Sequence, residues 1–146
     1  MGGYVHGYDW REAARLEYQA RTLEELLHAD TVFPDGSTVL EAGCGTGAQT
    51  VALARRSTGA RIVAVDVSAA SLTEARARVS AAGFGNVEFR QANLLALPFA
   101  PGSFDHVFLC FVLEHLPDPA ATLASLRPLL RSGGTITVIE GDHGST

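Results

Sequence analysis

Residues 39–47 have the sequence VLEAGCGTG, which changes from apolar and β-prone to glycine-rich. The segment AQTVALARR, residues 48–56, follows directly and has the pattern of a helix. A strand, a glycine loop and a helix in this order present backbone N–H groups and a helix N-terminus to a bound nucleotide. Glycine at every second position lets the backbone turn tightly and approach a ligand closely. Glu41, at the end of the strand, can receive a cation or a hydrogen-bond donor from the ligand or from a neighbouring loop.

The rest of the chain alternates between strand-like and helix-like segments. Apolar periodicity and turn residues predict helices over residues 9–28, 47–57, 68–83 and 118–130, and strands over 38–42, 61–66, 87–92, 104–111 and 135–140. The third helix starts at Ser68 or Ser71, and Ser71 with Glu74 matches a capping box. Such alternation implies parallel βαβ units with right-handed crossovers. The ligand cleft is expected beyond the carboxyl ends of the strands.

Length and composition limit the class of protein. The chain has 146 residues, 47% of them apolar and 18% charged, which suits one globular domain. We expect residues 1–37 to form a helical segment packed on a core of residues 38–146. The net charge is −5 and no basic run occurs, so a nucleic-acid partner is not expected. No apolar run reaches about 20 residues, and the N-terminus lacks the pattern of a signal peptide, so no membrane association is expected.

The two cysteines, Cys44 and Cys110, stand apart from each other and from any C-x-x-C unit. A zinc site is therefore not predicted, and no metal ligands are assigned. We interpret both residues as reduced thiols of a cytoplasmic protein. Cys44 is expected to fill space rather than to act as a nucleophile.

The glycine segment resembles a known motif. Glu41, Gly43, Cys44, Gly45 and Gly47 match E/D-x-G-x-G-x-G, the first motif of the class I S-adenosylmethionine-dependent methyltransferases. The resemblance is strongest to the small-molecule enzymes of ubiquinone and menaquinone biosynthesis (methyltransferase type 11/25). The same loop also fits the dinucleotide fingerprint G-x-G-x-x-G/A, so the loop alone does not separate a methyltransferase from an NAD(P)-binding domain.

Later segments favour the methyltransferase. Asn93 and Leu94, followed by LPF at residues 97–99, resemble the segment that brackets adenine in this family, with Asn in place of the usual Asp. Residues 104–116 resemble the fourth motif, in which Cys110 and Phe111 match positions beneath the methionine portion.

Asp66 follows Gly47 by 19 residues, at the tip of the second strand. An acidic residue there can accept both ribose hydroxyls of an adenosine ligand, and Val67 adjoins it.

The resemblance implies an α/β, Rossmann-like, doubly wound and mainly parallel sheet of order 3-2-1-4-5, with helices on both faces and an N-terminal helix. It also implies S-adenosyl-L-methionine as cofactor and in-line methyl transfer to a small-molecule acceptor. The alternatives are a non-catalytic S-adenosylmethionine-binding module, or a fragment that needs a partner chain. The family continues past the fifth strand, so we expect a complete adenosine site, an incomplete acceptor site and possible self-association through the edge of the fifth strand.

Several residues have a plainer structural explanation beside the functional one. Asp66 can cap the next helix and Asn93 can be a turn residue. Glu114 and His115 are weak candidates for an acid/base pair, because such residues more often orient a loop. The remaining candidates are in the N-terminal segment, with Tyr4, Tyr8 and Trp10 as a lid or as ordinary packing, and Arg15 and Gln19 as partners of the cofactor carboxylate.

Overall fold

The computed structural model describes residues 32–110, 112 and 115–139. Its elements are β1 (Thr38–Ala42), α2 (Ala48–Arg56), β2 (Arg61–Asp66), α3 (Ala69–Ala81), β3 (Val87–Gln91), β4 (Phe104–Cys110), α4 (Pro119–Leu126), the 3-10 turn η2 (Arg127–Leu129) and β5 (Leu130–Ile139). The predicted helix over residues 9–28, with Tyr4, Tyr8, Trp10, Arg15 and Gln19, lies outside the described residues, as do Phe111 and Glu114.

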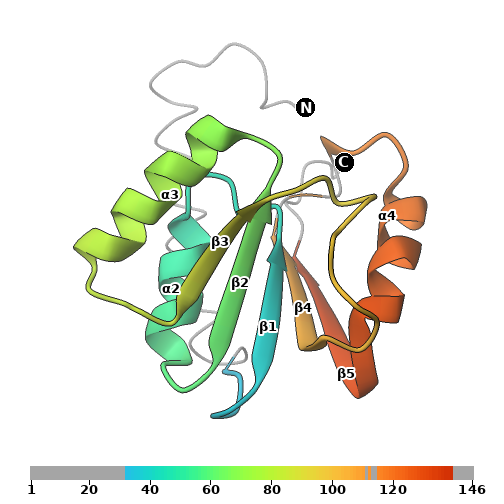
Figure 1. Cartoon of the computed structure of the whole chain (residues 1–146), viewed down its shortest axis with the longest axis horizontal. Helices are drawn as coiled ribbons and strands as arrows, with labels where there is room; N and C mark the ends of the chain where they lie inside the picture. The colour runs from blue at the N-terminus through green and yellow to red at the C-terminus, as the bar shows by residue number, and fades with distance from the viewer. Residues whose placement is uncertain (1–31, 111, 113–114, 140–146) are drawn as a thin grey trace.

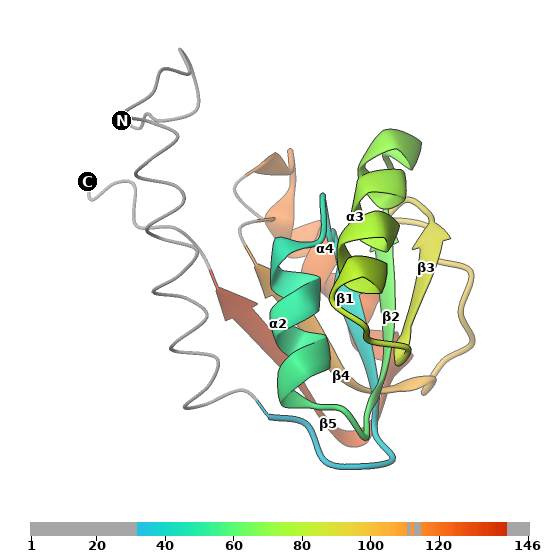
Figure 2. The ribbon, with the colours of Figure 1, turned by 90° about the vertical axis from the view of Figure 1, so that its left-hand side faces the viewer.

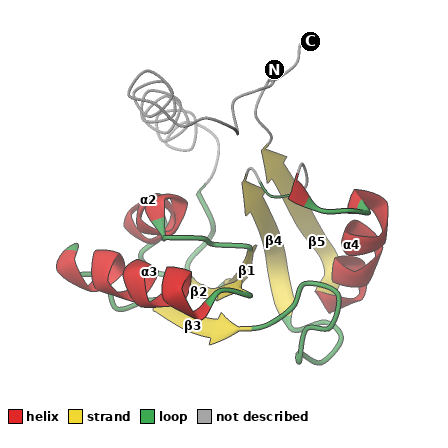
Figure 3. Ribbon diagram, turned by 90° about the horizontal axis from the view of Figure 1, so that it is seen from above, coloured by secondary structure: helices red, strands yellow, loops and turns green. Residues whose placement is uncertain are grey.

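The five strands form one sheet of order β3-β2-β1-β4-β5, and all four pairings are parallel. The predicted strand order and the doubly wound fold are confirmed. Helices α2 and α3 lie side by side on one face of the sheet, and α4 covers the other (Figures 1, 2 and 3). From β1 the chain adds β2 and β3 on one side of the sheet, and then returns to add β4 and β5 on the other side of β1. The direction of winding therefore reverses at β1. A cleft at the carboxyl ends of β1 and β4 follows from this reversal.

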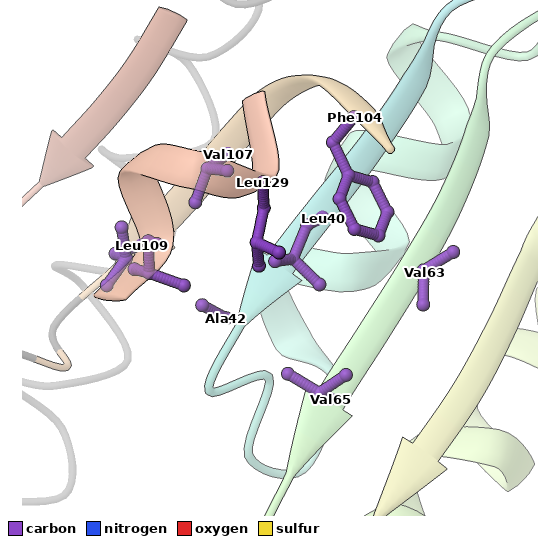
Figure 4. Packing of buried hydrophobic residues seen from close by; sticks show 9 residues of the cluster. Leu40, Ala42, Val63, Val65, Phe104, Val107, Leu109 and Leu129 are labelled. Atoms are coloured by element: carbon purple, nitrogen blue, oxygen red, sulfur yellow. The ribbon is translucent and has the colours of Figure 1, made fainter. Parts of the chain in front are cut away.

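Alternation along β1 assigns its side chains to the two faces of the sheet. Val39 packs in a cluster with Ala52 and Leu53 of α2. Leu40 and Ala42 face the opposite way, into a cluster that includes Leu109 of β4 and Leu129 of η2 (Figure 4). Leu40 and Ala42 are fully buried, as expected of a central parallel strand that has helices on both faces.

The start of α3 differs from one of the two predicted starts. The N-cap is Ser68, whose hydroxyl accepts a hydrogen bond from the backbone N–H of Ser71 at 3.1 Å. The capping box of Ser71 and Glu74 is therefore wrong, since Ser71 already lies in the first turn. Glu74 instead forms an exposed ion pair with Arg78, one turn further along the helix.

The segment from α4 to β5 also departs from the prediction. Helix α4 ends at Leu126 and continues as η2, and strand β5 begins at Leu130 rather than at residue 135. The register slips within β5, because Phe104 pairs with Leu130 whereas His106 pairs with Thr135. Gly133, with a φ of 83°, lies inside this irregular stretch. A local bulge of this kind is not visible in hydrophobic periodicity.

Candidate ligand-binding site

The glycine loop between β1 and α2 is fastened to the end of β2. The backbone N–H groups of Gly43 and Cys44 both donate to the carbonyl oxygen of Val65, at 2.9 and 2.8 Å. Gly47, the N-cap of α2, has a φ of 92°, and a Cβ there would lie 2.9 Å from both the Cα and the Cβ of Ala75 in α3. Glycine is thus required at position 47 by backbone conformation and by the close approach of α3.

A cavity of about 620 Å³ opens beside this loop, within the usual size range of small-molecule sites. It lies where the cleft was expected, at the carboxyl ends of the strands. The structure brings to it these predicted residues: Gly43, Cys44, Gly45, Asp66, Val67, Asn93, Leu94, Cys110 and His115. Two predicted residues, Glu41 and Gly47, are not part of its lining, and Phe111 and Glu114 lie outside the described residues.

Asp66 connects two walls of the cavity. Its Oδ2 accepts from the backbone N–H of Gly45 at 2.8 Å, and its Oδ1 accepts from the backbone N–H of Ser68 at 2.9 Å. The helix-capping alternative is therefore part of its role, although the cap hydroxyl itself comes from Ser68. A carboxylate has about four acceptor sites, so two remain for hydroxyl groups of a ligand.

Asn93 adopts the turn geometry that the plainer explanation predicted. Its Oδ1 accepts from the backbone N–H of Leu95 at 2.8 Å, which fixes the orientation of the side-chain amide. The next residue, Leu94, lines the same wall of the cavity. The turn and a ligand contact are compatible, because the amide retains two N–H donors and a second lone pair on its oxygen.

Cys44 lines the cavity but is only 7% exposed. Burial raises the pKa of its thiol to about 12, and the charges of Glu41 and Asp66 add to the rise. A thiol in this environment stays protonated at neutral pH and is a poor nucleophile. This property favours the predicted space-filling role.

Glu41 lies behind the loop rather than in the cavity. Its side chain is 2% exposed, and its Oε1 accepts a hydrogen bond of 2.5 Å from the hydroxyl of the fully buried Thr50 in α2. Burial raises the pKa of the Glu41 carboxyl to about 8. The Thr50 hydrogen bond acts in the opposite direction, and the charge of Asp66 adds to the rise. The donor to Glu41 is a residue of helix α2, neither the ligand nor a neighbouring loop as predicted, and no pattern in the sequence pointed to Thr50.

The opposite wall of the cavity comes from the segment after β4 and was mostly missed from the sequence. It contributes Val112, His115, Leu116, Pro117, Asp118 and Thr122. Asp118, the first residue of the helix predicted over 118–130, is the N-cap of α4, and its Oδ1 accepts from the backbone N–H of Ala121 at 3.1 Å. Irregular segments carry no periodicity, so no pattern indicated that the segment before α4 returns to the cavity.

The described residues contain no cluster of three or more His, Cys, Asp or Glu side chains placed to hold a metal ion. The family model described as a methyltransferase domain matches residues 39–134, about two thirds of the chain. The chain belongs to the methyltransferase domain family.

Relatives of this methyltransferase domain are longer than it is. It is 35% identical over 128 residues to a ubiquinone biosynthesis O-methyltransferase of Paracidovorax citrulli, covering 83% of the chain and 53% of that relative. A solved geranyl diphosphate methyltransferase in complex with GPP and sinefungin superposes with a TM-score of 0.69 at 27% identity, over 84% of the chain and 44% of that protein. The [4+2]-cyclase SpnF superposes with a TM-score of 0.74 at 26% identity, over 95% of the chain and 50% of that protein. The chain spans about half, or less, of the length of the curated relatives that it matches.

The glycine loop gives a matched pair of substitutions. Gly47→Ala forces a Cβ against the backbone of Ala75 and should lower the free energy of unfolding by about 2–4 kcal/mol, the sum of left-handed strain and overpacking. Gly45 has a φ of 55° and open space around its Cβ position. Gly45→Ala should therefore lower the free energy of unfolding only through left-handed strain, by about 1 kcal/mol. Urea denaturation without ligand measures both. Equal losses would contradict the packing of Gly47 against α3.

Proposed function

We propose that this domain binds S-adenosyl-L-methionine and transfers its methyl group to a small-molecule acceptor. The observation that carries the proposal is the convergence of three separate motif segments on one cavity. Gly43 and Gly45 come from the glycine loop after β1, Asn93 and Leu94 from the segment after β3, and Cys110 from the end of β4. These segments are far apart in sequence. The glycine loop also fits a dinucleotide-binding domain, but the two later segments resemble motifs of the methyltransferases and are not part of the dinucleotide fingerprint.

The residues present fit the cofactor. The open space at the missing Cβ of Gly45 lets a ligand approach the loop, and Asp66 keeps acceptor sites for ribose hydroxyls. Asn93, Leu94 and Cys110 all line the cavity, which supports the proposal that the first two bracket adenine and the third lies beneath the methionine portion. When bound, S-adenosylmethionine supplies a methyl group on a sulfonium, which an acceptor nucleophile displaces in line. The chain's residues therefore mainly bind, align and exclude water.

The acceptor is proposed to be a small, largely apolar molecule. The cavity lining beyond the cofactor residues is largely apolar, with Leu95, Val112, Leu116 and Pro117 beside the polar residues His115, Asp118 and Thr122. The names of the relatives, which include a ubiquinone biosynthesis O-methyltransferase and a geranyl diphosphate methyltransferase, support such an acceptor. His115 lines the cavity and is the described candidate for proton transfer. The alternative is a non-catalytic S-adenosylmethionine-binding module, or a fragment that needs a partner chain, and the turnover test below distinguishes it from an enzyme.

We also propose self-association through the edge of β5. Within the described part of the chain β5 pairs only with β4, and it borders a groove lined by Ala120, Leu123, Ala124, Arg127, Ile136 and Val138. Unpaired strand edges with apolar neighbours favour pairing with a second copy. Light scattering of the purified chain should show a dimer, and Val138→Lys should shift it toward monomer. A wild-type monomer at high concentration would contradict this proposal.

The location is proposed to be cytoplasmic, because a chain of this length with only two cysteines, outside any C-x-x-C unit, is typical of proteins that keep their thiols reduced. The described residues include no helix long and apolar enough to cross a bilayer.

Isothermal titration of the full chain with S-adenosylhomocysteine tests the cofactor assignment. We expect binding, with no heat from NAD in a parallel titration. Asp66→Ala removes both the ribose acceptors and the bonds to Gly45 and Ser68. The loss of charged hydrogen bonds should weaken binding about 10–100-fold.

Glu74→Ala is the matched control, because Glu74 is an exposed carboxylate of α3 outside the cavity lining. Its affinity should equal that of the wild type. Binding of NAD in preference to S-adenosylhomocysteine would overturn the methyltransferase proposal. A turnover assay then mixes the chain with S-adenosylmethionine and small phenolic acceptors. Cofactor binding without formation of S-adenosylhomocysteine in that assay would favour the non-catalytic module.

A further inference from the structure

The pair of Glu41 and Thr50 is the buried polar contact that spans the glycine loop. Glu41 is the penultimate residue of β1 and Thr50 lies in the first turn of α2, so their hydrogen bond of 2.5 Å closes the loop from beneath. Both side chains are buried, at 2% and 0% exposure. A carboxyl group in such a place is unfavourable when charged, and an apolar residue would fill the space at no such cost. Packing alone therefore gives no account of this pair.

The Glu41 carboxyl is electrostatically coupled to the cavity although it does not line it. The charge of Asp66 raises the pKa of Glu41, and the charge of Glu41 raises that of Cys44. Both Asp66 and Cys44 line the cavity. Because the coupling is reciprocal, a positive charge bound in the same cavity must act on Glu41 with the opposite sign and favour its ionised form.

The described surroundings of Glu41 offer it no cation. Its register partners are Ala64 in β2 and Phe108 in β4, neither of which titrates. Helix α2 contributes the Thr50 hydroxyl, and its basic residues Arg55 and Arg56 lie in the last turn, at the far end from the loop. The other titratable groups near the loop are Asp66, Cys44 and two arginines of α3. Arg76 acts on the pKa of Cys44, and Arg78 donates to the carbonyl oxygen of Thr46, whereas the pKa of Glu41 responds to burial, Thr50 and Asp66. His115 and Asp118 lie across the cavity.

We propose that Thr50 is a positioning residue for the cofactor: it holds the buried Glu41 carboxyl beneath the glycine loop, so that a cationic ligand in the cavity binds with release of the carboxyl proton. The inference rests on the proposed function, because S-adenosylmethionine carries a sulfonium and an ammonium charge. In the free protein the carboxyl is mostly protonated at pH 7. In the complex it is ionised, with the Thr50 hydroxyl donating to the charged oxygen. The proton goes to solvent, and affinity rises with pH.

Titration calorimetry at pH 7 in two buffers of different ionisation enthalpy measures the protons released. For wild-type protein and S-adenosylmethionine we expect release of up to about 0.9 proton, the protonated fraction of a group with a pKa of about 8. S-adenosylhomocysteine lacks the sulfonium charge and should release less. The ligand's own amino group titrates in the same range, so the informative quantity is the difference between variants.

Glu41→Gln should abolish the release and flatten the rise of affinity between pH 6.5 and about 8.5, the range in which a group with a pKa of about 8 loses its proton. This variant is expected to fold. The raised pKa means that the folded wild type holds a proton that the unfolded chain has lost, so wild-type stability falls as pH rises from about 4.5 to about 8. The glutamine has no such dependence and should be at least as stable at pH 7.

Thr50→Val keeps the shape of the side chain and removes the donor that favours the ionised carboxyl. It should reduce proton release and move the pH dependence of affinity upward, and Thr50→Ser should restore both. Loss of affinity that is equal at every pH would show a purely structural role and overturn the proposal. Unchanged proton release in Glu41→Gln, with binding intact, would overturn it while leaving the proposed function standing. Failure of the wild type to bind either ligand would overturn both.

Discussion

The end of β2 holds the glycine loop in place, and the site depends on this attachment. The carbonyl oxygen of Val65 accepts two N–H groups of the loop, and the carboxylate of Asp66 accepts a third from Gly45. The same carboxylate binds the N–H of Ser68, which caps α3. One strand end therefore orients the loop, the start of α3 and the floor of the cavity together. This arrangement brings α3 close to Gly47 at the start of α2. Any larger residue at position 47 would push α2 and α3 apart.

The order of the sheet makes this attachment functional. Strand β1 lies between β2 and β4. The segments that follow β1 and β4 lead to helices on opposite faces of the sheet (Figure 1), so a cleft opens between the carboxyl ends of these two strands. Residues from the end of β2, from the segment after β3 and from the end of β4 meet at this edge, although they span positions 66–110 of the chain. The cyclase SpnF shares the fold, which shows that the architecture alone does not fix the chemistry. The motif residues in the cavity are what favour methyl transfer.

Much of this arrangement was predictable from the sequence, for identifiable reasons. The four central residues of the strand over 61–66, IVAV, are apolar and buried, as expected of a strand covered on both faces, and its terminal Asp66 gave the acceptor position. The glycine spacing gave the loop, and the alternation of elements gave a parallel sheet. The strand order came from the resemblance to a family and not from any local pattern.

Most of the features that the sequence did not predict depend on contacts distant in sequence, and the capping box at the start of α3 is an exception. The position of Glu41 behind the loop follows from strand alternation, since Leu40 and Ala42 face α4, but its partner Thr50 is set by the approach of α2. The capping box at Ser71 matched a local pattern, and the extended conformation of Ser68 overrode it. The bulge in β5 and the cavity wall after β4 depend on how α4 packs, which no short window of sequence encodes.

The most direct test is a titration of the isotopically labelled chain with S-adenosylhomocysteine, followed by the backbone amide resonances in solution. The account predicts that the largest shifts fall on the loop and on the strand ends that face the cavity, above all on Gly45, whose N–H is bound to Asp66, and on Asn93 and Leu94. Resonances of the groove between α4 and β5 should stay in place. Shifts confined to that groove, or absent from Gly45 and Leu94 at saturation, would contradict the central claim that the glycine loop and the end of β2 form the cofactor site.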